Sequence, residues 1–85
     1  MTEKRILGVL ITDRKQEAGE VQKVLTQHGC SIKTRLGLHE VTQEQSSKEG
    51  LIILELIGDV TEMGKLEESL EKIPGTQTKK MIFNG

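Results

Sequence analysis

Two short apolar runs restrict the possible folds of this chain most strongly, because both faces of each run are apolar. They span residues 5–12 (RILGVLIT) and 51–57 (LIILELI). Their length and their β-branched residues favour strands over helices. Successive side chains of a strand point to opposite sides of the sheet. Strands that are apolar on both sides are typical of the middle of a sheet, where both faces are covered.

A segment with the spacing of an amphipathic helix follows each run. In each segment, residues at helical spacing form a stripe that would face the core. In residues 13–28 the stripe consists of Ala18, Val21, Val24, Leu25 and His28. In residues 59–73 it consists of Val60, Met63, Leu66, Leu70 and Ile73. Asp13 with Gln16 and Asp59 with Glu62 have the pattern of a capping box, which predicts where each helix begins. Gly29 and Pro74-Gly75 predict where the helices end.

Two less apolar segments predict the remaining strands. Residues 31–39 (SIKTRLGLH) alternate, which predicts one buried face with Ile32, Thr34, Leu36 and Leu38 and one solvated face with Lys33, Arg35 and His39. Residues 76–83 (TQTKKMIF) contain Lys79 and Lys80, charges that suit an edge strand. The polar residues 40–50 between the second and third strands predict a loop.

The two strand–helix–strand halves predict an α+β, ferredoxin-like βαββαβ fold, with a four-stranded antiparallel sheet and two helices on one face. The apolar runs then form the two central strands. A chain of 85 residues is expected to be one domain, residues 1–85. Two helices cover only one face, so apolar side chains on the other face would be exposed. The sequence therefore predicts a homo-oligomer, a dimer or tetramer, assembled through the open sheet face.

Charge and composition argue against several classes of function. Twelve basic and 13 acidic residues leave no basic excess for binding nucleic acid directly. RNA-recognition motifs share the predicted topology but stack bases on aromatic residues, and Phe83 is the only aromatic residue here. The chain has no paired nucleophile and base and no phosphate-binding glycine loop, so we expect neither catalysis nor a cofactor.

The cellular location also follows from simple features. One cysteine cannot form an internal disulfide, which favours a reducing cytoplasm. No apolar run approaches the ~20 residues that cross a bilayer, and the first residues do not resemble a signal peptide. We expect a cytoplasmic protein without membrane contact.

His28, Cys30 and His39 are the residues of the types that bind soft metal ions. Cys30 and His39 lie at opposite ends of one predicted strand, roughly 30 Å apart at about 3.3 Å per residue. One chain therefore cannot bring both to one ion, and we expect no metal site. The alternative roles are a histidine that caps a helix, a buried thiol and an exposed edge histidine.

Residues 13–32 (DRKQEAGEVQKVLTQHGCSI) resemble the opening of an ACT domain, with Gly19 and Gly29 at the corresponding places. The resemblance implies a small-molecule site where two copies meet. Free amides at a helix N-terminus suit a carboxylate or phosphate. The candidate ligand-binding residues are Thr12, Asp13 and Arg14, with Gly29, Cys30 and Ser31 as the wall from the partner. The alternative is a helix cap, a surface charge and a plain turn.

The first strand (GVLITDR), the second strand (TRLGLH) and the Gly-Asp after the third also resemble short bacterial iron-only hydrogenase system regulators. That group is similar to the ligand-sensing domain of the nickel-responsive repressor. The resemblance implies a stand-alone regulatory or sensor domain, linked to transcription of hydrogenase, that homo-oligomerises and binds a small ligand at the subunit interface. A pure assembly module without a ligand and a metal-responsive, nickel-type regulator remain as alternatives.

Overall fold

The computed structural model describes residues 3–12, 14–38 and 49–84. Every predicted helix and strand is present, with ends within two residues of the predicted ends. The elements in chain order are β1 (Glu3–Ile11), α1 (Arg14–Gln27), a 3-10 turn η1 (Gly29–Ser31), β2 (Ile32–Leu38), β3 (Gly50–Leu56), α2 (Val60–Glu71) and β4 (Thr76–Asn84). Asp13, His39 and most of the predicted loop, residues 40–48, lie outside the described residues.

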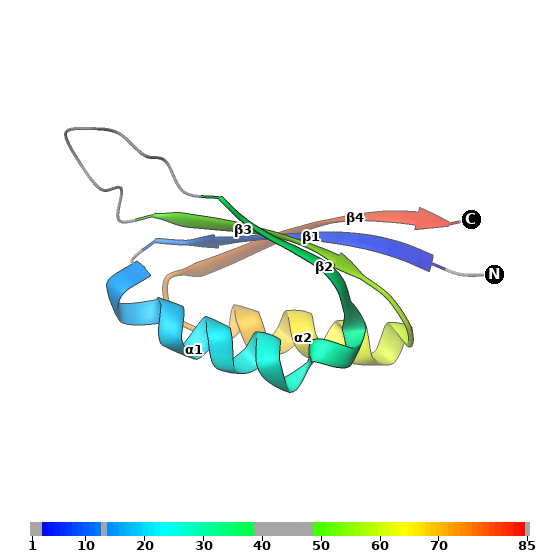
Figure 1. Ribbon diagram of the computed structural model, residues 1–85, viewed down its shortest axis with the longest axis horizontal. Coiled ribbons are helices and arrows are strands. Elements are labelled where there is room, and N and C mark those ends of the chain that lie inside the picture. The colour runs from blue at the N-terminus through cyan, green and yellow to red at the C-terminus, as the bar shows by residue number, and fades with distance from the viewer. Residues whose placement is uncertain (1–2, 13, 39–48, 85) are drawn as a thin grey trace.

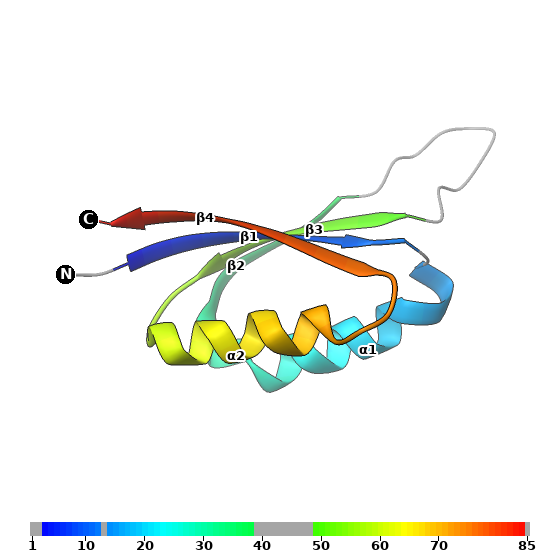
Figure 2. The ribbon, with the colours of Figure 1, turned by 180° about the vertical axis from the view of Figure 1, so that it is seen from behind.

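The four strands form one sheet in the order β2-β3-β1-β4, and all three neighbouring pairs are antiparallel. Both helices lie side by side on one face of this sheet (Figures 1 and 2). The predicted α+β, ferredoxin-like topology is confirmed. The two apolar runs form the central strands, as predicted, and the two less apolar segments form the edges.

The hydrophobic core lies between the sheet and the helices. Every second residue of β1 and β3 points into it, because side chains alternate across a strand. The core consists of Leu7, Val9 and Ile11 from β1, Val21 and Leu25 from α1, Ile52, Leu54 and Leu56 from β3, and Met63, Leu66 and Leu70 from α2. The predicted helix stripes are largely correct. Val60 is an exception, since it lies at the first position of α2 and is exposed.

Side-chain capping and glycine turns fix the ends of α2. The Asp59 carboxylate accepts a hydrogen bond from the Thr61 N–H at 2.8 Å, which satisfies one of the free amides at the start of the helix. Glu62 pairs with Lys65 at 2.9 Å. Gly58 and Gly75 flank the helix with φ angles of +91° and +80°, a conformation that glycine adopts without steric cost. The predicted capping box at Asp13 lies outside the described residues.

Because of a β-bulge, the residues of β2 that face the helices differ from those predicted. The register with β3 shifts between Ile32 and Thr34, and such a shift moves the following side chains to opposite faces. Ile32 packs against the core, whereas Leu36 points away from the helices and is 53% exposed. Arg35 points towards the helices and donates a hydrogen bond to Gln22 of α1. The predicted single buried face was therefore wrong.

Candidate functional site

The sheet face opposite the helices is the main candidate for a functional surface. We call it the open face, because no helix of the described chain covers it (Figure 1). The strand register places four neighbouring groups of side chains on it. The groups are Thr34 and Leu36 from β2, Leu51, Ile53 and Glu55 from β3, Lys4, Ile6, Gly8 and Leu10 from β1, and Gln77, Lys79, Met81 and Phe83 from β4.

Apolar side chains dominate the open face. Met81 and Phe83 are 58% and 53% exposed, and Leu51 is 36% exposed. Ile6, Leu10 and Ile53 are half-buried by their neighbours in the sheet. The largest apolar patch of a typical monomer covers about 300–600 Å², and patches of this size are often functional. The exposed apolar face that the sequence predicts is therefore present, with the features of an interaction surface.

The charged residues of the open face are separated by sign. Glu55 lies on β3, where Thr34 Oγ1 donates a hydrogen bond to it at 3.0 Å and Lys33 Nζ lies 3.9 Å away. The open-face lysines, Lys4 and Lys79, lie on β1 and β4. The β3 side of the face therefore carries an acidic group that pairs with Lys33, and the opposite side carries basic groups.

The predicted ligand residues lie at the two ends of α1. Thr12 follows β1, and both its N–H and its Oγ1 donate hydrogen bonds to the Gly75 carbonyl, at 3.0 and 2.8 Å. Arg14 is the first residue of α1. Thr12 thus ties the end of β1 to the turn before β4. Asp13 lies outside the described residues.

Gly29, Cys30 and Ser31 form η1 at the other end of α1. The Ser31 N–H donates to the His28 carbonyl at 2.9 Å, and the Ile57 N–H donates to the Ser31 carbonyl at 2.8 Å. A helix of 14 residues is about 21 Å long at 1.5 Å per residue. One copy therefore does not bring Gly29–Ser31 to Thr12 and Arg14, and a site built from both groups needs two copies. Ligand binding by these residues stays a prediction.

The candidate metal ligands do not form a cluster in the described part of the chain. His28 is half-buried before η1 and makes no capping hydrogen bond with its side chain. Cys30 is exposed, so the prediction of a buried thiol was wrong, because η1 carries this residue on the surface. His39 lies outside the described residues. The described residues contain no group of three His, Cys, Asp or Glu side chains that could hold a metal ion.

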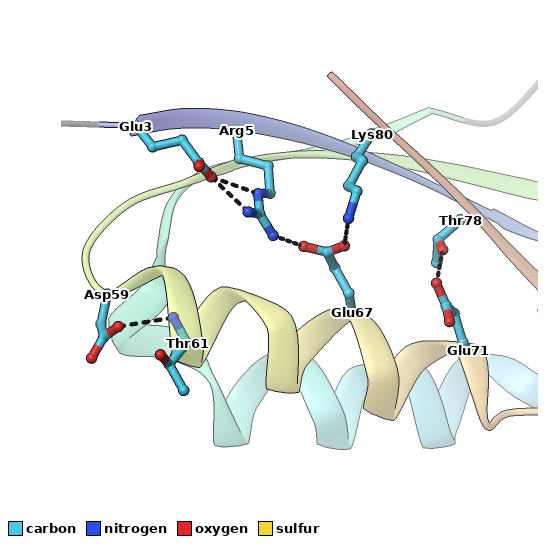
Figure 3. Close-up of polar contacts among 8 residues, drawn as sticks. All are labelled: Glu3, Arg5, Asp59, Thr61, Glu67, Glu71, Thr78 and Lys80. Atoms are coloured by element: carbon cyan, nitrogen blue, oxygen red, sulfur yellow. Dashed lines mark hydrogen bonds and ion pairs between the residues drawn. The ribbon is translucent and has the colours of Figure 1, made fainter. Parts of the chain in front are cut away.

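A partly buried charge cluster lies between the sheet and α2 (Figure 3). We define it as Glu3, Arg5, Glu67 and Lys80, and sequence reasoning missed it. Arg5 donates hydrogen bonds to Glu67 and, through Nε at 2.9 Å, to Glu3, and Lys80 Nζ donates to Glu67 at 3.0 Å. The side chains of Arg5 and Glu67 are only 7% and 9% exposed. Lys80 lies on an edge strand and is 48% exposed, as predicted, but it also pairs with the buried Glu67.

The charge cluster holds its arginine in the charged form. Burial by itself lowers the pKa of Arg5, but the hydrogen bonds and charges of Glu67 and Glu3 outweigh it, and the pKa is raised above its usual value. The folded state therefore favours the charged guanidinium. The raised pKa of Arg5 contributes to stability below the pKa of the unfolded-state guanidinium, and this contribution is lost as the pH rises through the raised pKa. The cluster has the features of a structural contact between α2 and the sheet.

The described helices include none that is long and apolar enough to span a membrane. No protein-family model matches the chain, and no curated protein matches it. Among solved structures, an uncharacterized protein from Thermotoga maritima is similar with a TM-score of 0.82 and 25% identity. The similarity covers 99% of this chain and 100% of the other. The fold is ferredoxin-like.

Two further ferredoxin-like structures are regulatory proteins by name. One is named as a transcriptional repressor of the glycine cleavage system, with a TM-score of 0.64 and 18% identity over 100% of this chain and 48% of the other. The other is CPII from Thiomonas intermedia, a nitrogen regulatory PII-like protein solved with ADP, AMP and bicarbonate. Its TM-score is 0.58 at 14% identity, over 98% of this chain and 92% of the other. These likenesses show that this chain shares its fold with both proteins.

Proposed function

We propose that this protein is a regulatory domain that acts as a homo-oligomer assembled through its open face. The observation that carries the proposal is the apolar character of that face. Four strands spaced about 4.8 Å apart and about seven residues long give a flat area of roughly 450 Å². Two such faces together give roughly 900 Å², and their side-chain relief adds to this. The sum lies near the lower limit of about 1,000 Å² for a specific interface, so we expect association at micromolar concentrations.

The proposal includes a small ligand at the junction between copies. The fold is shared with a PII-like regulator that was solved with two nucleotides and bicarbonate, which supports a sensor role. Thr12, Asp13 and Arg14 of one copy would bind an anionic group of the ligand. The turn Gly29–Ser31 of another copy would close the site, because the length of α1 separates the two groups within one chain.

We also propose that the protein is not an enzyme and that it acts inside the bacterial cytoplasm. The pairing of the buried charges in the charge cluster with one another supports a structural role for them. The resemblance of the first and second strands to iron-only hydrogenase system regulators makes hydrogenase expression the first process to test. Since no part of the sequence resembles a DNA-reading element, control of transcription would require a separate DNA-binding chain.

Light scattering after size exclusion, at several micromolar concentrations, tests self-association. We expect a mass of two or four chains, and a monomer at every concentration would contradict the proposal. Thermal-shift measurements with single amino acids, ADP, AMP, bicarbonate and nickel test the sensor role. A rise in the melting temperature with one of these, reduced by Arg14→Ala, is the expected result. The control is Lys23→Ala, which removes an exposed basic residue of the same helix.

One alternative has a specific observation in its favour. The separation of Thr12 and Arg14 from Gly29–Ser31 means that a single copy has no site built from both groups. If the protein forms oligomers but none of the compounds changes its melting temperature, a pure assembly module is the better description. A shift with nickel alone would favour the metal-responsive alternative.

A further inference from the structure

We propose that a second copy of this chain packs on the open face about a two-fold axis parallel to β1 and β3 and midway between them. In this arrangement Ile53 of each copy fills a depression above Gly8 of the other copy. The inference rests on the self-association proposed above. It goes further because it specifies which residues of the two copies meet. The inference can therefore be wrong even if the protein self-associates.

Gly8 makes the depression. It lies on a central strand of the open face, between Ile53 of β3 and Lys79 of β4. A Cβ atom at Gly8 would lie 3.7 Å from the Lys79 carbonyl oxygen and 4.0 Å from Ile53 Cδ1, which is ordinary van der Waals contact. Its φ angle is not positive, so neither space nor backbone conformation demands glycine within one copy. A glycine inside a strand often marks the close approach of another backbone.

Symmetry brings Ile53 to this depression. A two-fold axis parallel to the strands, midway between β1 and β3, exchanges these two strands between the copies. Each residue of β1 then faces the residue that is its own cross-strand neighbour in β3. Because Gly8 is the neighbour of Ile53, and Leu10 of Leu51, Ile53 faces Gly8 and Leu51 faces Leu10 of the second copy. Ile53 thus meets a depression and Leu51 meets another apolar side chain, whereas Ile6 faces the charged Glu55.

The alternative axis, perpendicular to the strands, does not give this match. It places β1 over β1 and β3 over β3 of the second copy. Ile53 then faces another part of β3 and never reaches Gly8. The depression and the side chain that fits it would remain apart, so shape complementarity favours the axis along the strands.

The charges on the open face favour the same axis. Glu55 is the cross-strand neighbour of Ile6, so it faces Ile6 of the second copy. Lys4 of that copy lies two residues further along the same face, about 7 Å away, within reach of two extended side chains. The contact occurs twice by symmetry. Opposite charges at such a contact fix the register of two partners.

The first test fills the depression. Gly8→Val adds a side chain whose Cβ makes only ordinary van der Waals contacts within one copy, but which would collide with Ile53 of the second copy. We expect the dimer dissociation constant, measured by analytical ultracentrifugation, to rise about tenfold or more. The matched control is Gly37→Val, because Gly37 lies opposite Ile52 on the helix-facing side, with open space around its Cβ. The control should dimerise like the unchanged protein.

The second test exchanges the charges. Glu55→Lys and Lys4→Glu should each weaken their own dimers, because like charges then meet twice. A mixture of the two variants should form a mixed dimer, in which both contacts join opposite charges. Native mass spectrometry of the mixture measures the mixed and pure dimers. We expect the mixed dimer to exceed its statistical half, although Glu55→Lys also removes the local contacts with Thr34 and Lys33.

Two results would overturn the inference without touching self-association. One is a dimer dissociation constant that is the same for the unchanged protein and for Gly8→Val. The other is a mixture that holds no excess of mixed dimers while the unchanged protein dimerises. A wild-type protein that stays monomeric would instead remove the proposed function and this inference together.

Discussion

At the scale of single residues, the charge cluster beneath the sheet shows the strongest dependence on one side chain. Glu67 accepts hydrogen bonds from both Arg5 and Lys80, so it joins β1 and β4 to α2 (Figure 3). Removing one partner of a buried ion pair is costly, because it leaves an uncompensated charge out of contact with water. The remaining carboxylate, Glu3, compensates Arg5 only in part.

We therefore expect Glu67→Ala to lower the free energy of unfolding by about 3 kcal/mol. Urea denaturation followed by circular dichroism measures the change. The control is Glu68→Ala, since the adjacent Glu68 is exposed and pairs only at 3.8 Å with the exposed Lys72. That control should cost less than about 0.5 kcal/mol. Equal losses of unfolding free energy for the two variants would show that the buried contact contributes no more stability than the exposed one.

The sequence contained evidence that Glu67 is buried, although a charged residue is usually expected at the surface. Position 67 lies four residues after Met63 and three before Leu70, within the stripe that defines the buried side of α2. An acidic residue there indicates a buried partner, and Arg5 at a core-facing position of β1 is the matching base. The prediction of a buried thiol at Cys30 failed for another reason: the sequence pattern did not reveal the 3-10 turn.

At the scale of elements, side-chain capping and the β-bulge determine where helices begin and which way strands face. Asp59 begins α2 by accepting a hydrogen bond from the Thr61 amide. Asp59→Ala should destabilise the protein by about 1 kcal/mol, because that amide loses its partner. Asp59→Ser should retain most of the stability, and chemical denaturation compares the two. An unchanged stability in Asp59→Ala would mean that water replaces the cap without loss.

The bulge in β2 gives a second prediction for this scale. Leu36 is 53% exposed, whereas Leu54 belongs to the core and is fully buried. Leu54→Ala should cost about 2–5 kcal/mol of unfolding free energy, whereas Leu36→Ala should cost less than about 0.5 kcal/mol in the monomer. Urea denaturation at low protein concentration measures both. A large loss for Leu36→Ala would mean that Leu36 is buried, as the alternating sequence predicted.

Alternation predicted the wrong faces of β2 because a bulge inserts one residue without changing the composition of the strand. The sequence around Ile32, Lys33 and Thr34 alternates normally, so nothing marks the extra residue. The bulge adds Leu36 to the open face, which is therefore more apolar than the sequence predicted.

At the scale of the whole molecule, the topology was predictable because the central strands are apolar on both sides and the edge strands are not. The candidate ligand site was not predictable to the same degree. Its residues lie at opposite ends of α1 in one copy, so their meeting depends on contacts between chains that no pattern within one chain specifies. The exposed apolar character of the open face, in contrast, was predictable from the sequence and is present in the structure.

Self-association predicts a concentration-dependent melting temperature. Mass action stabilises a folded state that binds a second copy. The midpoint should rise as protein concentration increases from below to above the dimer dissociation constant, by about 4–8 °C for each kcal/mol gained. Differential scanning fluorimetry with an external dye measures it. Leu36→Ala should reduce this rise, and a midpoint independent of concentration in the unchanged protein would contradict self-association through any surface.

The exposed Phe83 has a practical consequence. It is the only aromatic residue of the chain apart from two histidines, and it lies on the open face with 53% exposure. In proton NMR spectra recorded after the N–H protons have been exchanged for deuterium, its ring signals should therefore stand apart from all others except the imidazole signals. A molecule that packs against the ring would change its chemical shifts and restrict its rotation. The ring signals therefore report contact at this surface without isotope labelling.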